Sequence, residues 1–341
     1  MVTSDSPTTR PDLGRDATWI DEARVRAVLP QRAADAHKWG VGGVVVIAGS
    51  PSYPGAAAMT CRAAGRAGAG IVMLATGRGV IGTIASSIPE VAYIPLPETE
   101  SLSGARKAIE LIGEQLEKSR AAVVGPGLGS DDANDGLLGG LFGLAQHGNA
   151  VRSSIGFTVA SSSAQIASEP ARAGMFEYQD LHIVIDADAL NWLARQSSWW
   201  ERIPPQRAIL TPHPGEMSRL LDISADEVTG DPVAAVGEAA RRWNQVVVLK
   251  GAYTAVSDGT TTFVADLAAP SLATAGSGDV LAGTIGALVA QVRSPLDAAM
   301  IALYVGPRAA KRLEEKYGVL GVIAPDLPDA IAAELALLSD A

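Results

Sequence analysis

The stretch "LATAGSGDVLAG" (272–283) places three glycines around one acidic residue, Asp279, ahead of an apolar run. A glycine-rich turn that opens a helix directs free N–H groups and the positive end of the helix dipole at one spot. The backbone of Gly276, Ser277 and Gly278 therefore predicts an anion site. Asp279 then has two interpretations: a helix N-cap, or a general base that takes a proton from a hydroxyl while the anion site holds a transferring phosphoryl group.

A lysine ends one of the apolar runs, in "LKGAYTAV" (249–256). Lys250 has either of two roles, an ordinary residue at a strand end or a contact to nucleotide phosphate. In the second case the following turn lines the nucleotide with backbone. The residues that this turn contributes are Gly251, Ala252, Tyr253 and Thr254.

A histidine stands between two prolines in "LTPHPGEMSRLL" (210–221). The prolines stiffen the turn, which favours His213 as a ligand contact over a structural histidine. Glu216 suits the first turn of the helix that follows, where a negative charge is favourable.

Two further loops follow apolar strands. "VVGPGLGS" (123–130) is a glycine turn in which Gly127 and Gly129 would let a substrate approach the backbone. "DADALN" (186–191) places Asp186 and Asp188 at a strand end, where they either order Mg²⁺ through water or cap the next helix. The four histidines show no metal-ligand spacing, and a single cysteine argues against structural zinc.

Several classes of protein are disfavoured. The chain has no Walker loop GxxxxGK[ST], and the "GAG" at 68–70 leads to Met73 where a third glycine of a Rossmann fingerprint would stand. A net charge of −10 argues against nucleic-acid binding. We expect no membrane span and no signal peptide, since no apolar run is long enough and the N-terminus is polar. Cys61 is the only cysteine, which is typical of a reducing cytoplasm.

The elements that must position these residues alternate between strands and helices. Apolar runs predict strands at 42–49, 71–76, 121–125, 182–188, 207–212 and 245–251, with a hairpin at 253–265. Helices are expected at 19–29, 54–68, 105–119, 278–291, 295–316 and 325–338. This alternation predicts an α/β fold with three αβα layers and a mostly parallel sheet, whose ligand sites lie beyond the carboxyl ends of the strands.

The expected organisation is a disordered tail at 1–18 and one domain at 19–341 with an insertion at 130–180. The insertion is rich in Gly, Ser and Ala and has weak periodicity. It is either a loose surface loop or a flap or oligomer contact.

Taken in order, seven motifs resemble the ADP-dependent NAD(P)H-hydrate dehydratases of the ribokinase-like superfamily. They are "HKWGVG", "GSPSYPGAA", "GPGLG", "DADAL", "LTPHPGE", "LKGAYT" and "AGSGDVLAG". The resemblance runs from about His37 to the C-terminal helices, apart from 130–180.

The resemblance implies repair of the hydrated cofactors NADHX and NADPHX, the (6S)-hydrates, to NADH and NADPH. ADP, or ATP in eukaryotic relatives, would phosphorylate the ring hydroxyl with Mg²⁺, and phosphate would leave, with AMP as the other product of ADP. The nucleotide would contact Lys250 to Thr254 and the turn ending at Gly278, and the hydrate would contact Ala56, the "GPGLG" turn, His213 and Asp279. A cytoplasmic homo-oligomer, with a tetramer favoured, and a separate epimerase are also implied.

The chain departs from the family pattern in three places. Ala275 stands where many relatives have glycine, which would cost about 1 kcal/mol or more if that residue were left-handed. Trp39 follows the His-Lys pair where a glycine is common, and the 130–180 segment is long. Two alternatives stay open: a vitamin-precursor kinase of the same fold, and a catalytically silent nucleotide-binding regulator, which would not need Asp279.

Overall fold

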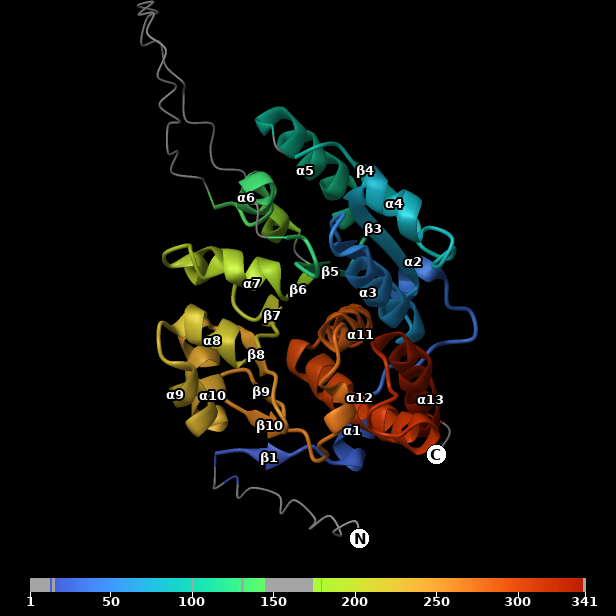
Figure 1. Cartoon of the computed structure of the whole chain (residues 1–341), viewed down its shortest axis with the longest axis vertical. Coiled ribbons are helices and arrows are strands. Elements are labelled where there is room, and N and C mark those ends of the chain that lie inside the picture. Colours follow the sequence, from blue (N-terminus) through green and yellow to red (C-terminus); the bar gives the residue numbers. More distant parts are fainter. Residues whose placement is uncertain are drawn as a thin grey trace, which may run out of the picture.

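The computed structural model describes residue 13 and residues 16–99, 101–129, 132–144, 174–178 and 180–339 (Figure 1). The strands are β1 (Thr18–Trp19), β2 (Gly43–Ile47), β3 (Ile71–Gly77), β4 (Ala92–Leu96), β5 (Ala121–Val124), β6 (His182–Ile185), β7 (Ala208–Leu210), β8 (Val246–Leu249), β9 (Ala255–Ser257) and β10 (Thr262–Val264). The α-helices are α1 (Glu22–Val28), α2 (Lys38–Val41), α3 (Pro54–Arg66), α4 (Arg78–Ile84), α5 (Leu102–Leu116), α6 (Asp132–Leu141), α7 (Asp188–Leu193), α8 (Pro214–Leu221), α9 (Ala225–Gly230), α10 (Pro232–Trp243), α11 (Ser277–Val292), α12 (Pro295–Tyr317) and α13 (Leu327–Ser339). Four short 3₁₀ helices complete the described elements: η1 (Gly174–Glu177), η2 (Trp199–Arg202), η3 (Pro270–Leu272) and η4 (Ala324–Asp326).

The strands form one sheet of ten in the order β1-β10-β9-β8-β7-β6-β5-β2-β3-β4. Pairing is parallel from β8 through β4, while β9 and β10 form the antiparallel hairpin expected at 253–265. The mostly parallel sheet is therefore confirmed.

The central strands are buried on both faces because they consist almost entirely of β-branched and small residues. In β2, Val44 and Val46 pack into the core on one side of the sheet, and Val45 and Ile47 pack into the core on the other. Such continuous apolar runs are typical of parallel sheets covered by helices on both faces.

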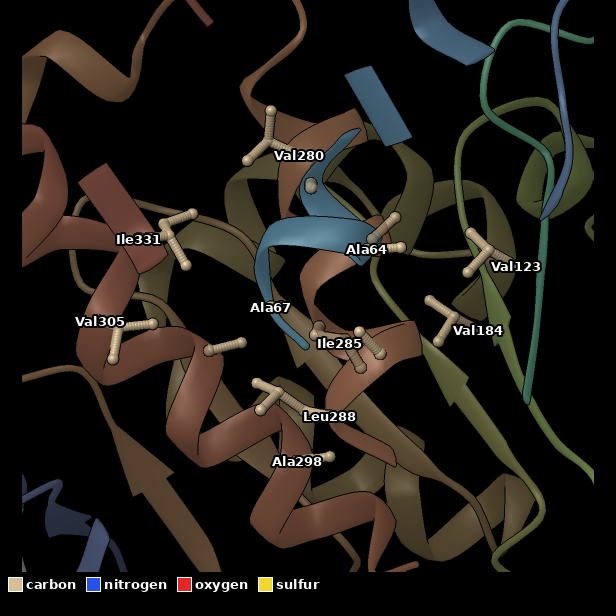
Figure 2. Packing of buried hydrophobic residues seen from close by; sticks show 14 of the residues in the cluster. Ala64, Ala67, Val123, Val184, Val280, Ile285, Leu288, Ala298, Val305 and Ile331 are labelled. Atoms are coloured by element: carbon tan, nitrogen blue, oxygen red, sulfur yellow. The ribbon is translucent and has the colours of Figure 1, made fainter. Parts of the chain in front are cut away.

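Helices α3, α11, α12 and α13 lie on one side of the sheet, and α5 to α10 lie on the other (Figure 1). Helix α11 packs between the sheet and the other helices of its layer, with Ile285 and Leu288 in the middle of that core (Figure 2). Gly283 allows α11 to approach α3 this closely, because a Cβ there would collide with the backbone carbonyl of Thr60. The three-layer αβα architecture is thus confirmed.

Some elements differ from the sequence expectation. Strand β4 and helix α4 were not expected from the sequence. In β4, Pro95 weakens the strand pattern, because proline is tolerated only in strands at the edge of a sheet, and β4 is such an edge strand. Residues 18 and 19 form the opposite edge strand, β1, rather than the start of a helix.

The expected tail at 1–18 and insertion at 130–180 lie mostly outside the described residues. The described ends of the insertion are ordered elements: α6 buries Leu137, Leu138 and Leu141 in the core, and η1 buries Met175 and Phe176. These anchors show where the segment leaves and rejoins the domain.

The order in which strands are added to the sheet reverses between β2 and β5, which are parallel neighbours: β3 and β4 lie on one side of β2, and β5 to β8 lie on the other. Beyond their carboxyl ends the loops after β2 and β5 meet, since the Gly49 N–H donates to the Pro126 carbonyl at 2.9 Å. Such a reversal is where open α/β sheets bind ligands. The "HKWG" motif lies at the amino ends of the parallel strands, where His37 caps α2 just before β2 begins.

In the part of the chain that the structure describes, the helices are all too short or too polar to cross a lipid bilayer.

Candidate active site

Helix α11 begins at the carboxyl edge of the sheet with Gly276 as its N-cap at φ 93°. This left-handed conformation suits glycine, and a Cβ there would also collide with the Met59 side chain. Ala275 does not adopt a positive φ, so the strain expected at that position does not arise. The turn therefore presents the first N–H groups of α11 to the space in front of the helix.

Asp279 lies in the first turn of α11 and is partly buried. Burial raises the pKa of its carboxyl group to about 7, and the negative charge of Asp186 adds to this while Lys250 opposes it. A carboxyl group with a pKa near neutral can accept and release a proton under physiological conditions.

Lys250 follows β8 and lies between two buried acids. Its Nζ is 2.8 Å from Asp186 Oδ1 and 3.8 Å from Glu216 Oε2, and the side chains of these acids are 2% and 5% exposed. Burial lowers the pKa of Lys250, but Asp186 and Glu216 outweigh burial and raise it, so the ammonium group stays charged. Lys250 is therefore a fixed positive charge beside the anion site.

Gly278 brings the α11 turn against this cluster. A Cβ on Gly278 would lie 3.6 Å from Lys250 Nζ and 3.8 Å from Asp186 Oδ2. The backbone donors of the turn and the lysine ammonium thus face the same small space.

The "DAD" motif divides its two carboxylates between two partners. Ala187, between them, has φ 51° and ψ −118°, a conformation that costs a non-glycine residue of order 1–3 kcal/mol. Asp186 turns toward Lys250, and Asp188 Oδ2 accepts a hydrogen bond of 2.8 Å from the Gly129 N–H. Asp188 therefore ties the "GPGLG" turn to the acidic cluster.

His213 is the N-cap of α8, and its Nδ1 accepts hydrogen bonds from the backbone N–H groups of Gly215 and Glu216 at 3.0 and 3.3 Å. Glu216 completes a capping box by accepting from the His213 N–H at 2.8 Å. Burial lowers the pKa of His213, and Lys250 and Arg219 add to this. The lowered pKa favours the neutral ring, and since Nδ1 accepts, its proton lies on Nε2, which is 3.6 Å from Glu216 Oε1.

Ala56 and Gly127 meet at the reversal point of the sheet. Gly127 has φ 63°, and a Cβ there would lie 2.7 Å from the Ala56 Cβ and 2.9 Å from the Tyr53 Cβ. The "GPGLG" turn therefore packs directly on the first turn of α3, and the expected hydrate contacts Ala56, Gly127 and Gly129 lie together.

A largely apolar cavity of about 540 Å³ opens on the other side of the α11 turn. Of the residues expected to bind nucleotide, those that line it are Lys250, Gly251, Ala252, Thr254, Ser277 and Gly278. Gly276 and Tyr253 do not line it: Gly276 caps α11, and the Tyr253 ring packs edge-on against Trp19 at 5.6 Å.

Most of the cavity wall was not expected from the sequence. It comes from the segment after β10 and from one face each of α11, α12 and α13, including Leu267, Leu281, Leu303, Pro307 and Ile331. Its size and apolar lining suit a purine nucleoside, with Lys250 and the α11 turn at the end where phosphates would lie.

A second cavity, of about 600 Å³, is lined by Gly129 and Asp188 and shares no lining residue with the apolar cavity. Its other lining residues are Asn134, Asp135, Leu138, Asn191, Trp192, Ala194, Arg195, Arg219 and Asp222. None of these was predicted as a site residue.

The described residues contain no group of three His, Cys, Asp or Glu side chains able to hold a metal ion directly. The carboxylates of Asp186 and Asp188 are nevertheless close enough to Asp279 to raise its pKa. Mg²⁺ keeps several waters and binds through one or two carboxylates together with substrate phosphates, so this set of oxygen donors fits Mg²⁺ bound through water.

Comparisons with known proteins agree with this geometry. The NAD(P)H-hydrate dehydratase family model matches residues 44–149 and 166–333. The bifunctional NAD(P)H-hydrate repair enzyme Nnr of Salinibacter ruber is 34% identical over 94% of this chain, which spans 53% of that relative's length. The ADP-dependent (S)-NAD(P)H-hydrate dehydratase of Listeria monocytogenes is 29% identical, with 91% of each chain covered.

Solved structures show the same fold. An ADP/ATP-dependent NAD(P)H-hydrate dehydratase from Bacillus subtilis, co-crystallised with ATP/Mg²⁺, has a TM-score of 0.71 and 23% identity and covers 95% of this chain and all of its own. A ribokinase-like superfamily protein from Enterococcus faecalis has a TM-score of 0.74 and 20% identity, covering 96% of this chain and 99% of its own. The expected ribokinase-like architecture is thereby confirmed.

Proposed function

The chain belongs to the NAD(P)H-hydrate dehydratase family, and we propose that it dehydrates the (6S)-hydrates of NADH and NADPH with ADP or ATP as phosphoryl donor. The observation that carries this proposal is the position of Asp279. It stands in the first turn of α11, between Gly278 and Val280 in the sequence, which both line the apolar cavity, and burial raises its pKa to about 7. Asp188, which accepts from Gly129 of the "GPGLG" turn, lies close enough to add to this rise.

The apolar cavity takes the nucleoside of the phosphoryl donor, and the β-phosphate of ADP lies against the α11 turn and the Lys250 ammonium. The hydrate enters from the side of Ala56, Gly127 and His213. Asp279 takes the proton of the ring hydroxyl as its oxygen attacks the phosphoryl group. The positive dipole end of α11 stabilises the charge that develops on the transferring group.

Elimination completes the reaction. Hydroxide is a poor leaving group and phosphate a good one, so the ring nitrogen lone pair expels phosphate from the phosphorylated ring carbon. The iminium that forms loses a proton from the neighbouring ring carbon to water, which restores the ring double bond. AMP is left from ADP by the phosphoryl transfer, and the products of the elimination are the reduced cofactor and phosphate. His213 Nε2–H is the neutral donor on this side of the site and orients the hydrate.

Mg²⁺ fits the carboxylates of Asp186 and Asp188 through water, and when bound it neutralises phosphate charge. Asp186 also fixes Lys250, so its removal would disturb both positive charges of the site.

The test is recovery of reduced-nicotinamide absorbance from purified hydrates with Mg²⁺ and ADP, ATP or no nucleotide. Nucleotide-dependent recovery supports the dehydratase and identifies its donor. A stable phosphate ester made from a vitamin-precursor alcohol, with no recovery from either hydrate, would instead identify the kinase of the same fold.

We also propose a cytoplasmic homo-oligomer, with a tetramer favoured. The connection between α12 and α13 supports assembly, because Tyr317, Val319, Leu320 and Ile323 expose large apolar side chains there, and Leu320 is fully exposed. Cys61 is buried and has no disulfide partner, which suits a reducing compartment. Sedimentation as a monomer at micromolar concentration would overturn the assembly.

A further inference from the structure

We propose that the second cavity binds the pyrophosphate and the distal nucleoside of the dinucleotide hydrate, with Arg219 as the residue that holds the pyrophosphate. This inference rests on the proposed function. It assigns a binding site to the half of the substrate that does not react.

The substrate needs such a site because it is larger than the reacting ring. One side of Asp279 is occupied by the phosphoryl donor in the apolar cavity. The rest of the dinucleotide must therefore leave the reaction centre past Gly129, Asp188 and His213. The second cavity begins at Gly129 and Asp188, and its volume of about 600 Å³ is of the size that a nucleoside with its phosphates requires.

Arg219 lies where the chain of the substrate would enter this cavity. It is on α8, next to the His213 turn, since a Cβ on Gly215 would be 3.8 Å from Arg219 Nη1. Asn191 Oδ1 holds the guanidinium by accepting from Nε at 3.1 Å and from Nη2 at 2.8 Å. The Nη1 donors are left to face a ligand.

The charge of Arg219 is also uncompensated by an ion pair. No carboxylate of the described residues lies within 4 Å of its guanidinium, whereas Arg195, the other cation of the cavity, is paired with Asp135 at 2.7 Å. A neutral asparagine orients Arg219 without cancelling its charge, and a planar guanidinium suits two phosphate oxygens.

The acidic lining makes this one cation decisive. Asp135, Asp188 and Asp222 also line the cavity, in a chain of net charge −10. A pyrophosphate would be repelled there without Arg219, so loss of its charge must weaken binding of the dinucleotide and not of a substrate that lacks the pyrophosphate.

The test compares the dinucleotide hydrates with the hydrate of reduced nicotinamide riboside, which carries no phosphate, in Arg219→Gln. We expect KM for the hydrates of NADH and NADPH to rise by about tenfold or more, as for loss of a charge-assisted hydrogen bond, with kcat within about twofold. KM for the hydrate of reduced nicotinamide riboside should be unchanged. Arg219→Lys should recover part of the loss because it restores charge without the planar fork.

Arg202→Gln is the matched control. It removes the same charge from an exposed residue of η2, which precedes β7 and so lies toward the amino ends of the parallel strands. This variant should have the KM values of wild type. Binding of NADH, followed by its fluorescence, gives a readout independent of turnover, and Arg219→Gln should weaken it by the same factor.

Three outcomes would overturn the inference. One is an equal loss for the dinucleotide hydrates and the riboside hydrate, which would place Arg219 at the reacting half. Another is a loss confined to NADPH hydrate, which would assign Arg219 to the 2′-phosphate. The third is unchanged KM and NADH binding. Failure of the proposed function looks different, since wild type would then turn over neither hydrate with ADP or ATP.

Discussion

At the scale of single residues, Asp279 is the group on which the chemistry depends. Asp279→Asn keeps the size of the side chain and the backbone donors of the α11 turn, but removes the proton acceptor. We expect turnover to fall by roughly 10²–10⁴-fold, the usual contribution of a general base. Nucleotide affinity, measured by calorimetry, should change by less than about threefold because the anion site is backbone and Lys250.

That variant also separates the two interpretations of Asp279. An N-cap-like role predicts about 1 kcal/mol lost from the free energy of unfolding and near-normal turnover. Such a result would remove the base from the mechanism.

The pH dependence of the reaction follows from the same carboxyl group. Burial raises the pKa of Asp279 to about 7, and a base must be deprotonated to act. We therefore expect kcat/KM to fall about tenfold per pH unit below 7 and to level off above it. Glu216, whose pKa burial also raises to about 7, needs a control, so the inflection should persist in Glu216→Gln.

Stability should change in the opposite direction. A carboxyl group with a raised pKa in the folded state stabilises the fold fully below its unfolded pKa, here 3.8, and loses that contribution as pH rises through about 7. Urea unfolding from pH 4 to 8 should show this loss in wild type. It should be smaller in Asp279→Asn, and identical slopes in the two proteins would mean that the carboxyl group is not desolvated.

At the scale of elements, two glycines at the start of α11 should respond differently to alanine. Gly276→Ala places a Cβ at φ 93° and against Met59, so it should cost about 1–3 kcal/mol of unfolding free energy. Gly278→Ala meets only ordinary contacts at 3.6 and 3.8 Å and should fold normally. Its methyl group nevertheless fills the space beside Lys250, so ADP affinity should fall by roughly tenfold.

Thermal unfolding and calorimetry distinguish the two effects. If Gly278→Ala bound ADP as wild type does, the phosphates would not lie between the α11 turn and Lys250. Gly276→Ala measures the stability cost of a Cβ at the N-cap of the same turn.

The same elements show how far sequence reasoning reaches. The β-branched runs and glycine turns predicted the core strands, the hairpin and the start of α11, because local patterns determine them. Asp186, Lys250 and Gly278 come together because parallel strands end at one edge of a sheet, which the alternation of elements implies. Edge strand β4 escaped prediction because its sequence is weakened by Pro95.

Other features depend on packing that no local pattern records. Leu303 and Ile331 line the apolar cavity only because α12 and α13 cross near it. The ring of Tyr253 lies against Trp19 of the edge strand, a contact between parts of the chain far apart in sequence. Arg219 carries no motif, and only its distance from the His213 turn in the folded chain makes it a candidate.

At the scale of the whole molecule, the apolar cavity joins parts of the chain that are far apart in sequence. The turn after β8, the segment after β10 and helices α11, α12 and α13 all contribute to its wall. A nucleotide in this cavity should therefore stabilise the whole domain, since a ligand that binds only the folded state adds RT ln(1 + [L]/Kd) to its stability.

The size of this effect can be stated. At 100 times Kd, ADP adds about 2.7 kcal/mol. The unfolding entropy of about 2.1 cal/mol/K per residue gives about 0.7 kcal/mol/K for 341 residues, so Tm should rise by about 4 °C. Asp279→Asn should keep this shift, and Gly278→Ala should lose about half of it at the same ADP concentration, because tenfold weaker binding leaves about 1.4 kcal/mol. A shift equally large in Gly278→Ala would place the nucleotide outside the apolar cavity and the α11 turn. It would also overturn the proposed order of the two substrates around Asp279.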